Sequence, residues 1–128
     1  MSRPSPKPKN DERFSPYARL LIFRAPASAD GSYVASLMGA EGLDGPISRG
    51  WAISTGGCLL SGRIREHVET LLRAVAGKQD QLARLRREGY WVSIWFHDAA
   101  PPDADEFAAL SAELEALDIT FDFELERV

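Results

Sequence analysis

The sequence has very few of the residues that build disulfide scaffolds or metal sites. Among its 128 residues it holds one cysteine, Cys58, and two histidines, His67 and His97. A single cysteine forms no internal disulfide and makes a cysteine-based zinc site implausible. The segment Glu66 to Glu69 holds one histidine, whereas the zinc-helix motif needs two histidines four residues apart. We therefore expect no metal ion and no cofactor.

Long apolar runs and a surplus of positive charge are also missing. No apolar run approaches the roughly 20 residues that a membrane-spanning helix needs, and no apolar stretch follows the basic N-terminus, as it would in a signal peptide. The net charge is −4, whereas nucleic-acid binding requires a surplus of Lys and Arg. We expect a cytoplasmic protein that binds neither a membrane nor nucleic acid, and the single cysteine fits that reducing compartment.

The charges are segregated along the chain. The segment from Asp98 to Glu126 has ten acidic side chains and no Lys or Arg, whereas the segment from Arg63 to Glu88 has seven basic and four acidic ones. A charge run on a helix is usually its solvated face. The basic segment could still contact an anion locally, so both interpretations stay open.

Residues 1–16 contain four prolines and several charges, and we expect a disordered, proline-rich tail. Residues 17–128 match the size of one domain. Four stretches in this domain have strand patterns: Tyr17–Arg24, Trp51–Thr55, Tyr90–His97 and Ile119–Glu126. The first is apolar on both faces, which indicates a strand that is buried on both sides or central.

Helical patterns separate these strands. They cover Gly31–Gly39, then Gly62–Ala76 and Lys78–Glu88 on either side of Gly77, and a last helix that Asp103 caps with Glu106 three residues later. The order β-α-β-αα-β-α-β predicts an α+β fold: a four-stranded sheet with helices packed mainly on one face. Because the last strand is polar at alternate residues, the other face must be partly open.

Several of these segments resemble a bacterial family of uncharacterised proteins, the domain-of-unknown-function family 4279. The resemblance rests on Ser48-Arg49-Gly50 leading into Trp51–Thr55, the helical segment Arg63–Glu88, the strand Val92–Phe96 and the ending Leu117–Phe123. It covers about residues 17–126, and the loop before Trp51 is shorter and richer in glycine than in the family. The resemblance implies an α+β fold and no established activity, and it supplies no catalytic residues.

The third strand predicts the most unusual surface. Tyr90, Val92, Ile94 and Phe96 form its core side, which leaves Trp91 and Trp95 on the opposite face. If the last strand joins the same sheet, Asp122 and Glu124 share that face. Aromatic rings beside carboxylates suit a cationic or peptide partner. The other interpretation is that the tail, a loop or a second subunit of a homodimer covers the tryptophans.

The loop from Gly56 to Arg65 gives the alternative function. Gly57 precedes a helix that begins near Arg63 and Arg65, and backbone N–H groups with arginines can hold an anion. The loop lacks the Gly-Lys-Ser/Thr of a phosphate-binding loop, so a flexible turn is the other interpretation. A small-molecule binder or enzyme would use this loop and His97. However, no Ser or Cys within a recognisable nucleophile motif lies near His97 in the sequence.

The sequence therefore predicts an interaction module without catalytic residues. Its predicted contact residues are Trp91, Trp95, Asp122 and Glu124. A small acidic protein of this kind would suit an immunity or antitoxin role, in which it covers a basic partner surface.

Overall fold

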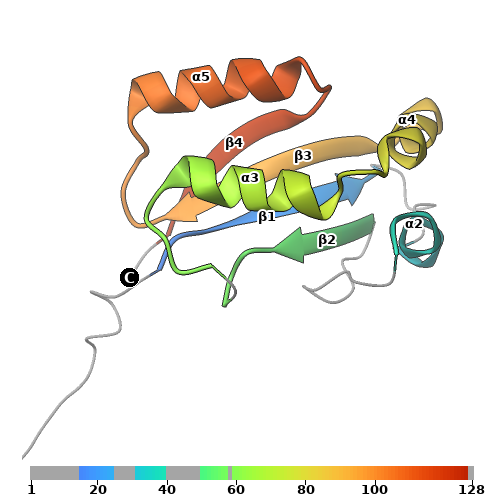
Figure 1. Ribbon diagram of the computed structural model, residues 1–128, viewed down its shortest axis with the longest axis horizontal. Helices are drawn as coiled ribbons and strands as arrows, with labels where there is room; N and C mark the ends of the chain where they lie inside the picture. The colour runs from blue at the N-terminus through green and yellow to red at the C-terminus, as the bar shows by residue number, and fades with distance from the viewer. Residues whose placement is uncertain (1–14, 25–30, 40–49, 58, 127–128) are drawn as a thin grey trace, which may run out of the picture.

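The computed structural model describes residues 15–24, 31–39, 50–57 and 59–126 (Figure 1). Most of the predicted tail and Cys58 lie outside these residues. The elements follow the predicted order: β1 (Tyr17–Phe23), α2 (Gly31–Met38), β2 (Gly50–Ser54), α3 (Ile64–Ala74), α4 (Gln79–Arg87), β3 (Trp91–Asp98), α5 (Ala104–Glu115) and β4 (Thr120–Leu125). The predicted α+β class is confirmed.

The four strands form one mixed sheet in the order β2-β1-β3-β4. Strand β1 is central, as predicted, and it is antiparallel to both neighbours. Its burial alternates along the strand, so it is fully buried on one face alone. Strands β3 and β4 are parallel, and α5 connects them. The segment β3-α5-β4 is therefore a parallel βαβ unit, whereas α2 connects the antiparallel strands β1 and β2.

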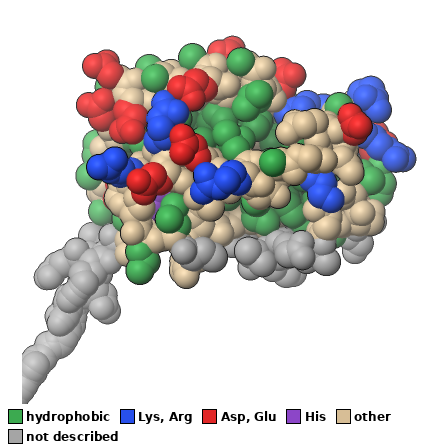
Figure 2. Space-filling view, viewed as in Figure 1, with side chains coloured by type: hydrophobic (Ala, Val, Ile, Leu, Met, Phe, Trp, Pro, Cys, Tyr) green, Lys and Arg blue, Asp and Glu red, His purple; other side chains and the backbone are tan. Residues whose placement is uncertain are grey.

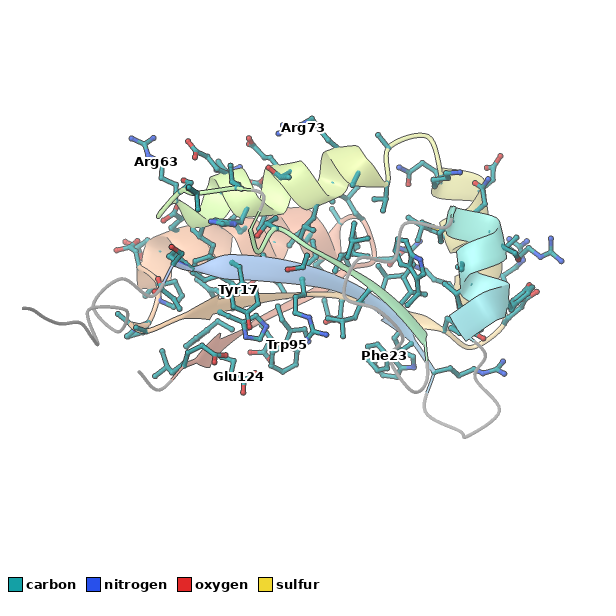
Figure 3. All side chains as sticks on the ribbon, turned by 90° about the horizontal axis from the view of Figure 1, so that it is seen from below. Tyr17, Phe23, Arg63, Arg73, Trp95 and Glu124 are labelled. Atoms are coloured by element: carbon teal, nitrogen blue, oxygen red, sulfur yellow. The ribbon has the colours of Figure 1, made fainter. Side chains whose placement is uncertain are left out.

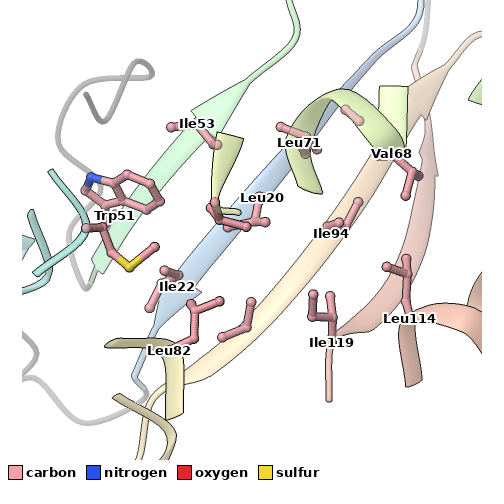
Figure 4. Close-up of a cluster of buried hydrophobic side chains, with 14 of the residues drawn as sticks. Leu20, Ile22, Trp51, Ile53, Val68, Leu71, Leu82, Ile94, Leu114 and Ile119 are labelled. Carbon is pink, nitrogen blue, oxygen red and sulfur yellow. The ribbon is translucent and has the colours of Figure 1, made fainter. Parts of the chain in front are cut away.

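The helices pack on one side of the sheet, where α3 and α5 lie along the strands (Figure 1). The core forms between these two layers because alternate residues of each strand point toward the helices. Its central members are almost fully buried, and Figure 4 shows Leu20, Ile22, Val68, Leu71, Leu82, Ile94 and Leu114 among them. Phe96 and Leu110 are equally buried. Tyr90, Val92, Ile94 and Phe96 are all buried, which confirms the predicted core side of β3.

Local signals at the helix ends explain where the helices stop. Gly77 has a φ of +86° between α3 and α4, a conformation that glycine adopts without strain, so the helical segment forms two helices. The Asp103 carboxylate accepts a hydrogen bond from the Glu106 N–H at 2.9 Å, as the predicted cap requires. Helix α5 ends at Glu115, and Leu117, two residues beyond it, is 50% exposed.

The charge segregation is also visible in space. Acidic side chains gather over α5, and basic ones gather at the end of the molecule where α4 lies (Figure 2). None of the helices in the described ranges is long and apolar enough to span a membrane.

Candidate functional site

The strand register shows which side chains share the face opposite the helices, here called the open face. They come from three adjacent strands: Tyr17, Arg19, Leu21 and Phe23 of β1; Trp91, Ser93, Trp95 and His97 of β3; and Thr120, Asp122 and Glu124 of β4. Trp95 pairs with Arg19 on one side and with Asp122 on the other. Figure 3 shows Tyr17, Phe23, Trp95 and Glu124 on the side of the sheet away from the helices.

The four predicted contact residues thus lie on one surface, which we call the aromatic–acidic face: Trp91, Trp95, Asp122 and Glu124. Trp91 is 59% exposed and Trp95 is half-buried, while both carboxylates are exposed. Trp91 stacks on Phe23 across the strands, with ring centroids 6.4 Å apart. The small side chain of Ser93 is buried between the two tryptophans. The surface is therefore an aromatic platform with acidic groups along its β4 side.

Two hollows adjoin these tryptophans. One is a groove of about 320 Å³ beside Trp95; its lining residues are Arg19, Leu21, Phe23, Trp95, His97 and Glu124. The other, of about 290 Å³, lies where β3 begins and includes Trp91 and Thr120 in its lining. The groove beside Trp95 would give an extended segment on the open face a side-chain pocket. The hollow at Trp91 is also lined by Arg86, Tyr90 and Val92, so it extends toward the helix side.

The charge of this surface is mainly negative. Arg19 is the one cationic side chain that the register places on the open face of the described strands. Against it stand the carboxylates of Asp122 and Glu124, and that of Glu126, which reaches His97 on the same face. A cation approaching the tryptophans therefore meets carboxylates as well as ring faces.

His97 joins this surface at the end of β3. Its ring stacks on Tyr17, with centroids 4.6 Å apart and planes inclined by 9°. Nδ1 lies 2.9 Å from Glu126 Oε2 and 3.7 Å from Glu124 Oε1. The opposite ring nitrogen, Nε2, is buried and has no hydrogen-bond partner among the described residues. His97 is thus a nearly buried imidazole facing two carboxylates, a cluster that the sequence patterns did not reveal.

The residues of the predicted anion site lie elsewhere. Figure 3 places Arg63 on the helix side of the sheet, opposite Trp95. Gly57 lies in a turn with a φ of +77°. Arg65 makes two hydrogen bonds to Glu113 of α5, at 2.9 and 3.1 Å, and these bonds raise the pKa of the Arg65 guanidinium and lower that of the Glu113 carboxyl. Arg65 therefore already has a partner that joins α3 to α5.

A second buried histidine, His67, holds the same loop in place. Its Nε2 lies 2.7 Å from the Ser61 carbonyl oxygen, which can only accept, so Nε2 carries the hydrogen. In the neutral ring Nδ1 then accepts from the Thr55 hydroxyl at 2.7 Å, while Thr55 Oγ1 accepts from the Ala18 N–H at 2.8 Å. These bonds connect the loop, α3 and β1. Both ring nitrogens of His67 are satisfied, unlike those of His97.

Comparison with known proteins does not identify a function for this site. No protein-family model matches the chain, and no curated protein or solved structure matches it either. The resemblance to the uncharacterised bacterial family therefore stays a prediction, and the site is interpreted from its own residues.

Proposed function

We propose that this protein is a binding module whose aromatic–acidic face holds a positively charged peptide segment of a partner protein. The observation that carries the proposal is that Trp95 lies beside Asp122 and shares a groove with Glu124, while Trp91 lies on the same open sheet face. A contiguous apolar patch rimmed by polar residues marks an interaction site more often than scattered apolar side chains do. Carboxylates next to them select for positive charge.

The energetics of such a surface favour Lys or Arg. A cation over an indole ring contributes about 0.5–2 kcal/mol, and more when the contact is shielded from water. Tryptophan is also enriched among the few residues that dominate binding energy at interfaces. The exposed carboxylates would act mainly through long-range attraction, which speeds association and weakens as salt is added.

The proposal also agrees with the overall charge. A small protein of net charge −4 with exposed carboxylates at Asp122 and Glu124 suits a basic partner. An immunity-like role, in which the face covers a basic surface of a toxin, is the specific form of this proposal.

Selection from a displayed library of short random peptides tests the preference directly. We expect the wild-type protein to select peptides enriched in Lys and Arg, with binding that weakens as ionic strength rises. Asp122→Lys should remove that enrichment because it places a cation beside Trp95.

Glu115→Lys is the matched control, since it makes the same change of charge at an exposed residue at the end of α5. It should leave the selected peptides unchanged. Wild-type selections without enrichment in Lys and Arg would contradict the proposal, as would equal effects of the two variants. A protein that binds only its own copies or its own N-terminal segment would contradict the choice of partner.

A further inference from the structure

The cluster at the end of β3 and β4 has the composition of a metal site. His97, Glu124 and Glu126 each offer one ligand atom, and these atoms all lie within 4.8 Å of one another. Glu124 and Glu126 are two residues apart on an extended segment, so their side chains leave the same side of the sheet. The parallel pairing of β3 with β4 places His97 directly opposite Glu124.

The spacing within the cluster is close to that of a tetrahedral site. Ligand atoms that are each about 2.0–2.1 Å from a tetrahedral zinc ion lie about 3.4 Å apart. The two distances from His97 Nδ1, 2.9 Å to Glu126 Oε2 and 3.7 Å to Glu124 Oε1, lie on either side of that value. The Glu124 and Glu126 oxygens lie within 4.8 Å of each other, and rotation of the two glutamate side chains would set their final distance around one ion.

Two carboxylates alone would be an ordinary solvated pair, but the imidazole makes this cluster different. The His97 side chain is only 6% exposed, and its Nδ1 faces both carboxylates. Its Nε2 has no hydrogen-bond partner in the described ranges, whereas protein groups satisfy both ring nitrogens of the other buried histidine, His67. Nδ1 is the ring nitrogen that points into the cluster, so it is the atom that would bind an ion held by the two glutamates.

We propose that His97, Glu124 and Glu126 form a binding site for a divalent transition-metal ion of the Zn²⁺ type. One imidazole nitrogen and two carboxylate oxygens give three protein ligands, the number found at zinc sites that keep one position open. The groove beside Trp95 borders two of these ligands, His97 and Glu124, so a bound ion would face it. A water molecule or a donor group of a ligand in the groove would take the fourth position.

The nitrogen ligand determines which metal the site prefers. Ca²⁺ and Mg²⁺ favour six or more oxygen ligands, whereas imidazole suits zinc and its neighbours in the transition series. The stacking of His97 on Tyr17 also holds the ring in one orientation. The inference does not depend on peptide binding: Glu124 belongs to both surfaces, but Glu126 is not part of the aromatic–acidic face.

Calorimetric titration of the whole chain with ZnCl₂ tests the site. We expect one ion bound per chain, and excess CaCl₂ should not displace it. Because loss of a second-sphere partner already weakens metal binding by about 10–100-fold, removal of a direct ligand in Glu126→Gln or Glu124→Gln should weaken it by at least that factor. Asp122→Asn, an exposed carboxylate on the same strand and face, is the control and should bind as wild type does.

Two further readouts keep the result independent of folding. Circular dichroism should show that all three variants are folded, and NMR signals of the His97 ring should shift on addition of zinc while those of His67 stay unchanged. Absence of stoichiometric zinc binding would overturn the proposal. So would equal weakening by Asp122→Asn, or displacement by calcium, because both would indicate a diffuse acidic surface. Since no peptide is present, this result is separate from the test of the proposed function.

Discussion

Replacing His67 with alanine is expected to lower the free energy of unfolding by about 3–5 kcal/mol. The side chain is completely buried, and its ring packs against Phe96 with centroids 5.7 Å apart. Alanine would leave a cavity and would remove the hydrogen-bond partners of the Thr55 hydroxyl and the Ser61 carbonyl group. Since whole domains are stable by only about 5–15 kcal/mol, this loss would bring the protein close to unfolding.

Urea denaturation of the wild type and the variant measures this change. His67→Gln should lose less stability, because its amide can still donate to the Ser61 carbonyl group. Glu69→Ala, an exposed change on the same helix, should alter stability by no more than about 0.5 kcal/mol. A loss below about 1 kcal/mol for His67→Ala would show that the loop from Thr55 to Ser61 is not held as described.

Replacing Trp95 with alanine is expected to weaken binding of a selected basic peptide by about 30-fold or more. A hot-spot tryptophan contributes at least about 2 kcal/mol, and each 1.4 kcal/mol corresponds to about a tenfold change in affinity. Trp95 is the residue with the best position for this role, because it lines the groove and pairs with Asp122. Fluorescence polarisation of the labelled peptide measures the effect, and Trp91→Ala should act in the same direction.

The control for this experiment is Leu60→Ala, since Leu60 is a large apolar side chain that is 82% exposed outside the open face. It should bind the peptide as the wild type does. A Trp91→Ala/Trp95→Ala double variant should remain folded by circular dichroism. If the double variant unfolds, the tryptophans belong to the packing of the fold and the proposed function loses its main support.

The type of each helix and strand and its buried side could be predicted from the sequence, because period-two and period-3.6 patterns report which side of an element is buried. The alternation from Tyr90 to His97 separated the core residues from Trp91 and Trp95 without any structure. The strand order was not predictable in this way. Alternation says which residues share a face of one strand, but not which strand lies beside it.

The cluster around His97 shows the consequence of that limit. Its members come from two strands, and His97 and Glu126 are 29 residues apart in the chain. No spacing motif records such a cluster, since the strand register alone brings the side chains together. The expectation of no metal site rested on helical and cysteine motifs, which could not test a site of this kind.

His67 had a signal in the sequence that could have been used. It lies three residues after Ile64 and four before Leu71, within the apolar stripe of α3, so its burial follows from helical periodicity. Its neighbours Glu66 and Glu69 gave the segment a partial likeness to the zinc-helix motif, which concealed the simpler interpretation of a buried histidine. The hydrogen bonds to Thr55 and Ser61 explain why a polar ring is tolerated at that position.

The most direct test of the account is an NMR titration of the isotope-labelled protein with a selected basic peptide, read at backbone amides and indole N–H groups. If the aromatic–acidic face binds the peptide, the largest shifts will fall on Trp91, Trp95 and Asp122 and on their neighbours on β1 and β4. Shifts centred on Gly57, Arg63 and Arg65 would contradict it, because they would place the binding site on the loop before α3.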